Sequence, residues 1–439
     1  MRFPREVIVA SDLVQSRPTG FQIKAAGAEA ATLIARLGEV DDGLSIWMSE
    51  GLSNSFLIVT PAGRVVINTG MGFEGPIHRS LYDTVDDGPI RYVLLTQGHV
   101  DHVGGVDRFL DEGTEVVAQE ANAACQADDA RIHAFRVRRS MPYWMDAVAA
   151  ADRFIRAHAG DGVPTQSRPT PTLTFRDRLE VELGGLRLEM LSVPGGETID
   201  SACVWLPDHG VAFVGNLFSA LFGHVPNLVT MRGDRYRFVE PFLESLERVR
   251  ALRPSLLLTG HFGPIAGAAV IDTELVRIGV AVRELHDQVL AGMNRGTDLW
   301  TLMAEVRLPE ELSLGEGYGK IGWAVRAIWE SYAGWFHARS TTELYPVPAA
   351  AVAPDLVALA GGIGPMLARA QARITAGEMV EALHLAEIAE QVAPEDPEVI
   401  ATLLAAHHGL LAEVEGQNFW ETGWLRTQIA TLGRRSAGA

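Results

Sequence analysis

A short run of histidines, an aspartate and glycines is the strongest chemical signal in this chain. It reads Gln-Gly-His-Val-Asp-His-Val-Gly-Gly over residues 97–105, and it directly follows residues 92–96, an apolar run that predicts a buried strand. Imidazole and carboxylate groups are the side chains that hold zinc, iron or manganese. His261 ends a second strand-like run, residues 256–261. These spacings predict a metal site built where strands end.

The segments around these runs predict two mixed sheets rather than a doubly wound parallel sheet. A Gly-Gly pair at 184–185 separates two strand-like runs, as in a tight hairpin. The expected strands are 56–60, 64–68, 92–96, 115–118, 179–183, 186–190, 202–206, 211–214 and 256–261. We therefore expect an α/β layered sandwich in the first part of the chain.

Beyond about residue 271 the strand signal stops and the apolar spacing becomes helical. We expect a hydrolase domain over residues 1–270, with an N-terminal extension at 1–45, and a helical domain over 271–439. The expected helices are 276–290, 325–335, 365–374, 379–392 and 397–415, with a frayed end at 434–439. Some of these pairs resemble tetratricopeptide hairpins. Alanine-rich apolar helices with little to cover them predict a homodimer through this C-terminal domain.

Composition restricts the possible partners. The formal net charge is −18 over 439 residues, which argues against a nucleic-acid role. No run of eighteen apolar residues predicts a membrane span. The first ten residues lack the apolar core and cleavage site of an export signal. Two cysteines, Cys125 and Cys203, are too few for a disulfide framework. We therefore expect a cytoplasmic enzyme with a small-molecule substrate.

Several motifs together resemble one known family. The run at 97–105 with His261 resembles the His-x-His-x-Asp-His signature of the metallo-β-lactamase fold, with Gln97 replacing its first histidine. Residues 194–197, Pro-Gly-Gly-Glu, look like the Pro-Gly-Thr-Glu of alkyl sulfatases of that fold. Residues 227–233 are similar to their Asn-Leu-Tyr-Thr-Leu-Arg-Gly stretch, and residues 324–335 look like their dimerisation domain. The resemblance implies an αββα sandwich followed by an all-α dimerisation domain.

The resemblance also implies a place for one metal ion and for the substrate. Asp101, His102 and His261 match the three residues that hold one ion of a pair. Asn227 and Arg232 match the residues that contact the sulfate group of an anionic ester. We place Asp101, Asn227 and Arg232 in the catalytic site. No residue is evident as the general acid.

The place of the second ion departs from the family pattern. Its predicted ligands are Gln97, His99 and Glu197, with Asn216 where the family has a bridging glutamate. Because an amide is a weaker donor than imidazole and Asn216 carries no charge, the negative charge is too small for two divalent ions. We predict one tight ion, Zn²⁺ with iron or manganese as alternatives, and a second ion that is weaker or absent. Asn68, where many members have an aspartate, weakens the support of the site further.

Three functions are compatible with these residues. A divalent ion lowers the pKa of bound water to near 7, and Arg232 with Asn227 would hold the anionic end of a sulfate ester. The preferred hypothesis is therefore a metal-dependent hydrolase of alkyl sulfatase type. The alternatives are a hydrolase re-tuned for another ester, a lactone or an ether, and a dimeric scaffold that has lost catalysis. His224, close to Asn227 in sequence, is a candidate general acid.

Overall fold

The computed structural model describes residues 30–38, 43–157, 165–229 and 231–438. Its contacts divide the chain into two compact units. The first unit contains the described residues of 21–139 and 144–331, and the second contains 140–143 and the described residues of 332–439.

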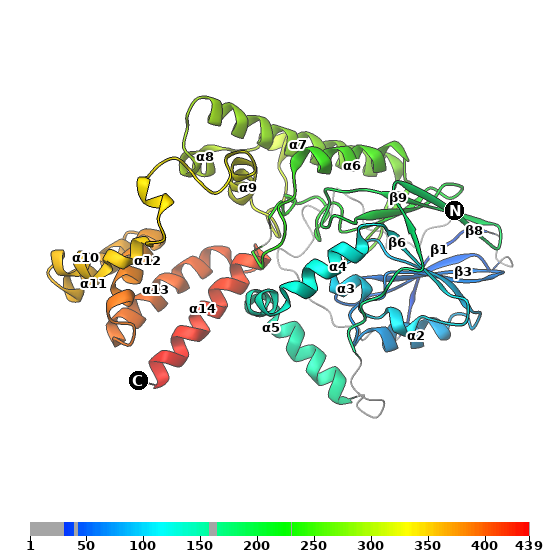
Figure 1. The fold of residues 1–439 in the computed structure, drawn as a ribbon, viewed down its shortest axis with the longest axis horizontal. Helices are drawn as coiled ribbons and strands as arrows, with labels where there is room; N and C mark the ends of the chain where they lie inside the picture. The colour runs from blue at the N-terminus through cyan, green and yellow to red at the C-terminus, as the bar shows by residue number, and fades with distance from the viewer. Residues whose placement is uncertain (1–29, 39–42, 158–164, 230, 439) are drawn as a thin grey trace. The chain divides into compact units, whose positions relative to one another are not determined.

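Two mixed sheets form the centre of the first unit (Figure 1). One sheet has seven strands in sequence order: β1 (Thr32–Arg36), β2 (Ser45–Ser49), β3 (Ser55–Thr60), β4 (Gly63–Ile67), β5 (Ile90–Leu94), β6 (Glu115–Gln119) and β7 (Leu173–Phe175). Strands β1 to β4 pair antiparallel, and β4 to β7 pair parallel.

The second sheet has six strands in the order β13 to β8: β8 (Arg178–Leu183), β9 (Leu186–Ser192), β10 (Ala202–Leu206), β11 (Val211–Gly215), β12 (Leu256–Thr259) and β13 (Ile265–Ala266). Only the pairing of β11 with β12 is parallel among these strands as the structure describes them. Both sheets are therefore mixed, as the sequence predicted.

Alternating side chains of the strands produce the layers. In β3, Phe56 and Ile58 join the apolar cluster between the two sheets, while Leu57 and Val59 join a cluster that includes Leu81 of a helix. Strands that are buried on both faces have continuous apolar sequences, and such runs can be recognised in the sequence. Figure 1 shows α6 and α7 on one side of the sandwich and α2 on the other. The αββα prediction is confirmed.

The helices of the first unit cover the outer faces of the sheets and carry the loops around the site. They are α2 (Gly75–Asp83), α3 (Val100–Val103), α4 (Asn122–Arg131), α5 (His133–Ala157), α6 (Val239–Ala251), α7 (Ala268–Asn294), α8 (Leu299–Glu305) and α9 (Ile321–Ala333). Residues 140–143 of α5 and the last residues of α9 are grouped with the second unit. Apolar side chains of α6, α7, α8 and α9 join one cluster with β10 and β11.

The second unit is helical. Its helices are α10 (Ala353–Leu359), α11 (Ile363–Thr375), α12 (Met379–Val392), α13 (Pro397–Val414) and α14 (Phe419–Gly438). Neighbours along the chain pack together, with Leu367, Ala386 and Leu403 buried between them. The expectation of a frayed end at 434–439 is wrong for 434–438, because α14 continues to Gly438 and Leu432 is buried in this core.

The part of the predicted N-terminal extension (1–45) that falls on residues 1–29 and 39–42 lies outside the described residues. Residues 32–36 of that stretch form β1, the edge strand of the first sheet. Among the described helices no single one is long and apolar enough to cross a membrane, although residues 349–359 and 363–375 would pass together as a pair bent by 102°.

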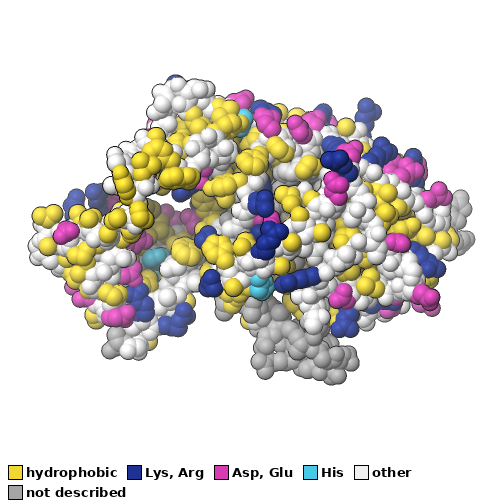
Figure 2. Space-filling view, in the orientation of Figure 1, with side chains coloured by type: hydrophobic (Ala, Val, Ile, Leu, Met, Phe, Trp, Pro, Cys, Tyr) yellow, Lys and Arg dark blue, Asp and Glu magenta, His cyan; other side chains and the backbone are white. Residues whose placement is uncertain are grey.

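Large apolar side chains are exposed over residues 332–359 of the second unit. Tyr332 is 57% exposed, Trp335 75% and Leu359 85%. Leu344, Tyr345, Val347, Val352 and Leu356 are exposed as well. Figure 2 shows hydrophobic side chains gathered at the surface in the part of the chain between α9 and α10. Contiguous apolar surface of this kind is typical of a protein interface.

Candidate metal centre

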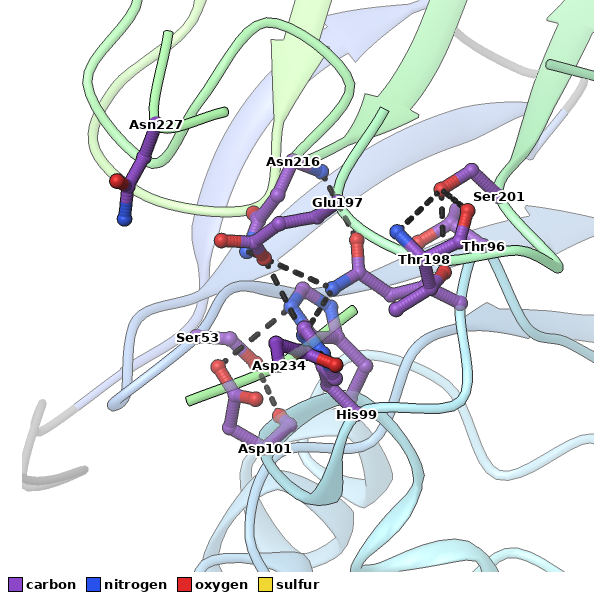
Figure 3. A network of polar contacts seen from close by, with 12 residues as sticks. Ser53, Thr96, His99, Asp101, Glu197, Thr198, Ser201, Asn216, Asn227 and Asp234 are labelled. Atoms are coloured by element: carbon purple, nitrogen blue, oxygen red, sulfur yellow. Dashed lines mark hydrogen bonds and ion pairs between the residues drawn. The ribbon is translucent and has the colours of Figure 1, made fainter. Parts of the chain in front are cut away.

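Strand ends from both sheets bring the predicted residues together. The loop after β5 carries residues 97–103, while the loops after β9, β11 and β12 carry Glu197, Asn216 and His261. Gly105 makes the first of these loops compact, since a Cβ there would lie 2.4 Å from the Thr69 carbonyl oxygen. Figure 3 shows Glu197 and His99 directed toward one another, with Asn216 and Asp101 on either side.

The first metal position consists of Asp101, His102 and His261. One ligand atom of each lies within 4.8 Å of the others. His102 Nε2 lies 3.5 Å and His261 Nε2 3.9 Å from Asp101 Oδ2. The two imidazole rings meet edge to face with centroids 5.9 Å apart. His102 Nε2 is buried and has no hydrogen-bond partner among the described residues.

Backbone contacts hold this position in place. The Ser53 hydroxyl donates to the Asp101 carbonyl oxygen, and the Asn54 side chain donates to the Thr259 and Phe262 carbonyls that flank His261. Burial lowers the pKa of His102 to about 4, so its imidazole is neutral at pH 7. A neutral imidazole is the form that binds a metal ion.

Asn68 contacts His102 directly. Its Oδ1 accepts the Thr96 backbone N–H at 3.0 Å, which fixes the orientation of the amide. Its Nδ2 therefore faces His102 Nδ1 at 3.0 Å. An aspartate here would accept a hydrogen bond from Nδ1–H and leave Nε2 free for a metal ion, whereas the amide donates to Nδ1 and favours the ring hydrogen on Nε2. The sequence prediction that Asn68 gives weaker support than an acid agrees with this contact.

Gln97 presents hydrogen-bond donors to the second metal position. Its Oε1 accepts the Asn216 backbone N–H at 3.1 Å. Its Nε2 lies 3.2 Å from Glu197 Oε2 and 3.1 Å from His99 Nδ1. Because the backbone N–H requires an acceptor and the carboxylate requires a donor, this amide orientation is the favourable one. The oxygen that would bind a metal ion is directed toward the backbone.

His99 lies between two carboxylates. Its Nδ1 is 3.3 Å from Glu197 Oε2, and its Nε2 is 3.1 Å from Asp234 Oδ2. Burial and the charge of Arg232 lower the pKa of His99, but hydrogen bonds to Asp234 and Glu197 outweigh them and raise it to about 9. This ring is therefore charged at pH 7 in the arrangement described, unlike that of His102.

Glu197 and Asn216 complete the contacts of the second position. Glu197 Oε2 accepts a 2.6 Å hydrogen bond from Asn216 Nδ2 in addition to its contacts with Gln97 and His99. Although burial raises the pKa of Glu197, the His99 hydrogen bond and the charge of Arg237 hold it well below its usual range. Asn216 Nδ2 is also 3.1 Å from His261 Nε2. Asn216 thus lies between the two metal positions.

Of the two predicted substrate residues, Arg232 contacts this cluster and Asn227 does not. Arg232 Nη2 is 3.2 Å from His99 Nε2 and 3.5 Å from Asp234 Oδ2. Asn227 is buried, and its side-chain Nδ2 lacks a hydrogen-bond partner within the described part of the chain. Its carbonyl oxygen accepts from Arg237 Nη1 at 2.6 Å. Figure 3 shows Asn227 apart from the hydrogen-bonded network.

His224, the candidate general acid, is buried and packs against residues 315–317. Its Nδ1 accepts the Gly317 backbone N–H at 3.0 Å, and its ring packs so closely on Gly315 that a Cβ there would lie 2.4 Å from it. These contacts fix the segment that precedes Tyr318. None of the hydrogen bonds described for His224 joins it to the metal ligands, so it remains a prediction as an acid.

Two residues at the site were not predicted. Asp234 contacts His99 and Arg232. Tyr318 is buried, and burial is the main cause that raises the pKa of its phenol, with the negative charge of Glu197 as the second cause. Asp234 stands between arginines in the sequence and resembles an ordinary surface acid there. Tyr318 comes from the segment between α8 and α9, which no sequence motif linked to the metal run.

Comparison with known proteins agrees with this architecture. Residues 48–261 match the metallo-beta-lactamase superfamily. Residues 301–424 match the alkyl sulfatase dimerisation family. The chain therefore combines a domain of the metallo-β-lactamase superfamily, a metal-binding superfamily, with an alkyl sulfatase dimerisation domain.

The relatives carry names of the same kind. A linear primary-alkylsulfatase of Pseudomonas sp. (strain ATCC 19151) is 29% identical over 360 residues, which are 77% of this chain and 67% of that protein. An alkyl/aryl-sulfatase of Saccharomyces cerevisiae is 23% identical over 70% of this chain and 50% of its own length.

A solved structure has the same fold. The stereoselective inverting sec-alkylsulfatase Pisa1 from Pseudomonas sp. has a TM-score of 0.76 at 22% identity, covering 92% of this chain and 66% of the other. The chain thus spans between half and two thirds of the lengths of these proteins.

The residues fit one metal ion better than two. At the first position three donors converge, and the buried His102 Nε2 has no hydrogen bond to another described residue. At the second position the Gln97 amide N–H donates to Glu197, and both ring nitrogens of His99 contact carboxylates. A second ion would therefore have to break hydrogen bonds that the side chains already make.

Proposed function

We propose that this protein is a metal-dependent hydrolase of sulfate esters of small organic molecules. The observation that supports it most is Arg232, a hydrogen-bond donor suited to an anion, 3.2 Å from His99 of the run that also supplies Asp101 and His102 to the metal cluster. The names of the relatives agree with this substrate class.

The side chains have separate tasks in this proposal. Asp101, His102 and His261 would hold the ion, for which Zn²⁺ suits a set of two imidazoles and one carboxylate. A bound divalent ion supplies water of lowered pKa. Iron or manganese would suit the same donors. We propose one tightly held ion here, because Gln97 and Asn216 leave the other position poorly compensated in charge.

Arg232 and Asn227 would hold the sulfate end of the substrate. A planar guanidinium can donate two parallel hydrogen bonds to sulfate oxygens and hold them while charge builds on the leaving group. The buried Asn227 amide can donate one more, since its Nδ2 has no other acceptor among the described residues. Burying a donor without a partner is costly, so this group is suited to a ligand oxygen.

Substitution of Arg232 tests the substrate class. We expect Arg232→Ala to lower kcat/KM for an alkyl sulfate by about 10²–10³-fold, the usual loss when one donor to developing charge is removed. Arg235→Ala is the matched control, because Arg235 is 67% exposed and pairs with Asp128. If Arg232→Ala leaves the turnover of every sulfate ester unchanged, the assignment is wrong. Turnover of carboxylic or phosphate esters instead would favour the re-tuned hydrolase.

We also propose a homodimer through the C-terminal helices. The exposed apolar side chains of residues 332–359 and the match to a dimerisation family support it. Sedimentation velocity at micromolar concentration tests it, with a monomer as the contrary result.

A further inference from the structure

Asp234 occupies a place where several positive groups meet. Its Oδ2 is 3.1 Å from His99 Nε2, 3.5 Å from Arg232 Nη2 and 3.9 Å from Arg237 Nη2. Its Oδ1 lies 3.0 Å from Arg136 Nη2. The side chain is 12% exposed. One carboxylate thus contacts three arginines and a metal-site histidine.

The backbone fixes Asp234 in this position. Gly233, with φ of +85°, makes the turn that directs Asp234 back toward His99. Arg139 holds the preceding segment by donating to the carbonyl oxygens of Met231 and Arg232 at 2.7 and 3.2 Å. Asp234 Oδ1 also accepts the Arg235 backbone N–H at 2.9 Å. The carboxylate is therefore held in place rather than free to move with solvent.

Three arginines surround Asp234, and of these Arg136 also pairs with Asp129 and Arg237 with Glu197, so Arg232 depends most on Asp234. Arg136, Arg232 and Arg237 are between 8% and 17% exposed, so their charges are weakly screened by water. Arg237 Nη2 is buried without a hydrogen bond to any described residue, 3.7 Å from Glu197 Oε1. A sulfate group held by Arg232 would meet the negative charge of Asp234 at close range.

We propose that Asp234 is the internal counter-ion of the sulfate-binding arginines. It positions the Arg232 guanidinium beside His99, and it limits how tightly the site holds sulfate, so that the product can leave. This inference rests on the proposed function, because it takes sulfate as the bound group. Asp234 acts through Arg232 and His99 and is thus a positioning residue.

Inorganic sulfate is the probe for this inference. Isothermal titration of the metal-loaded, full-length protein should show that Asp234→Asn binds sulfate at least about tenfold more tightly than the wild type, because a nearby like charge has been removed. With an alkyl sulfate, KM should fall and kcat should fall with it as product release slows. Asp129→Asn is the matched control. Asp129 lies 3.1 Å from Arg136 Nη1, the other terminal nitrogen of that guanidinium. Asp129→Asn therefore removes the same charge from a carboxylate that has no described contact with Arg232.

A double substitution tests whether the effect passes through Arg232. Sulfate affinity should rise less when Asp234→Asn is added to Arg232→Gln than when it is made alone, since the arginine through which Asp234 acts is then absent and only the repulsion between Asp234 and sulfate is removed. Unchanged affinity in Asp234→Asn, or an equal gain in Asp129→Asn, would overturn the inference. If Asp234→Asn does not fold, Asp234→Ser removes the same charge and is judged in the same way.

The binding measurement is independent of turnover. A wild type that hydrolyses no sulfate ester, but binds sulfate more tightly after Asp234→Asn, would refute the proposed hydrolase and support the counter-ion. A wild type that hydrolyses sulfate esters, with unchanged sulfate affinity in the variant, would refute the counter-ion alone.

Discussion

The two metal positions are neighbours but differ in how their side chains are satisfied. At the first, His102 Nε2 has no hydrogen bond within the described chain, and its ring is neutral at pH 7. At the second, His99 contacts Glu197 and Asp234 through both ring nitrogens and carries a proton. The first position keeps the Nε2 atom of His102 without a hydrogen bond, whereas the second position engages both ring nitrogens of His99 with carboxylates.

This difference shows how a metal position can be altered within an unchanged fold. Asn216 lies between the two positions and donates to Glu197 while it contacts His261. Gln97 and Asn216 turn amide donors toward Glu197, so hydrogen bonds satisfy a carboxylate that could otherwise bind a cation. The sandwich that positions the residues remains the same for both.

The largest expected effect comes from removing a ligand at the first position. His261→Ala should reduce the metal content from about one ion per chain to nearly zero, and activity should fall by more than about 100-fold, which is the upper range for groups that only support a ligand. Elemental analysis and an alkyl sulfate assay measure both. His133→Ala, an exposed histidine at the start of α5, is the control. Retention of the ion in His261→Ala would show that the first position is not the tight one.

A restored second position should take up another ion. The double substitution Gln97→His and Asn216→Glu adds an imidazole and a carboxylate, so we expect metal content to rise from about one to about two per chain. Each single substitution should give a weaker second site. Metal titration of the wild type is the reference measurement. Two ions bound there with equal affinity would contradict the contrast between the positions.

The smallest expected effect concerns His78, which contacts Ser49 and belongs to neither position. Burial lowers its pKa to about 4, whereas in the unfolded chain it is about 6.5. The contribution of His78 to the free energy of unfolding is therefore fully present above pH 6.5. It is lost as the pH falls toward 4, at a rate on the order of 1.4 kcal/mol per pH unit.

Denaturant unfolding of the metal-free protein measures this loss. In the His78→Gln variant the free energy of unfolding should fall less steeply as the pH is lowered, by the equivalent of about one bound proton. Equal slopes in both proteins would show that folding does not lower the pKa of His78.

The sandwich could be predicted because its strands are buried on both faces. The runs 56–59 and 202–206 are continuously apolar, and each lies in a strand. The edge strand β1 was not foreseen, since Thr32 and Arg36 are exposed and break the apolar pattern. The final helix, α14, was not foreseen, and a frayed end was expected at 434–439, because Leu432 finds its buried neighbours only in the folded core.

At the site, residue types were predictable and orientations were not. The motif at 97–102 with His261 indicated which ligands come together. The direction of the Gln97 amide depends on the backbone N–H of residue 216, which is 119 positions away in the chain. The contact of Asp234 with His99 likewise spans 135 positions. No local pattern carries information over such distances.

The tight packing at Gly260 limits the space open to the side chain of residue 216. A Cβ at position 260 would lie 2.2 Å from Asn216 Oδ1 and 2.8 Å from His102 Cε1. A glutamate at 216 is one methylene longer and has to find room against this loop. A second ion would therefore have to offset poorer packing as well as balance the new charge.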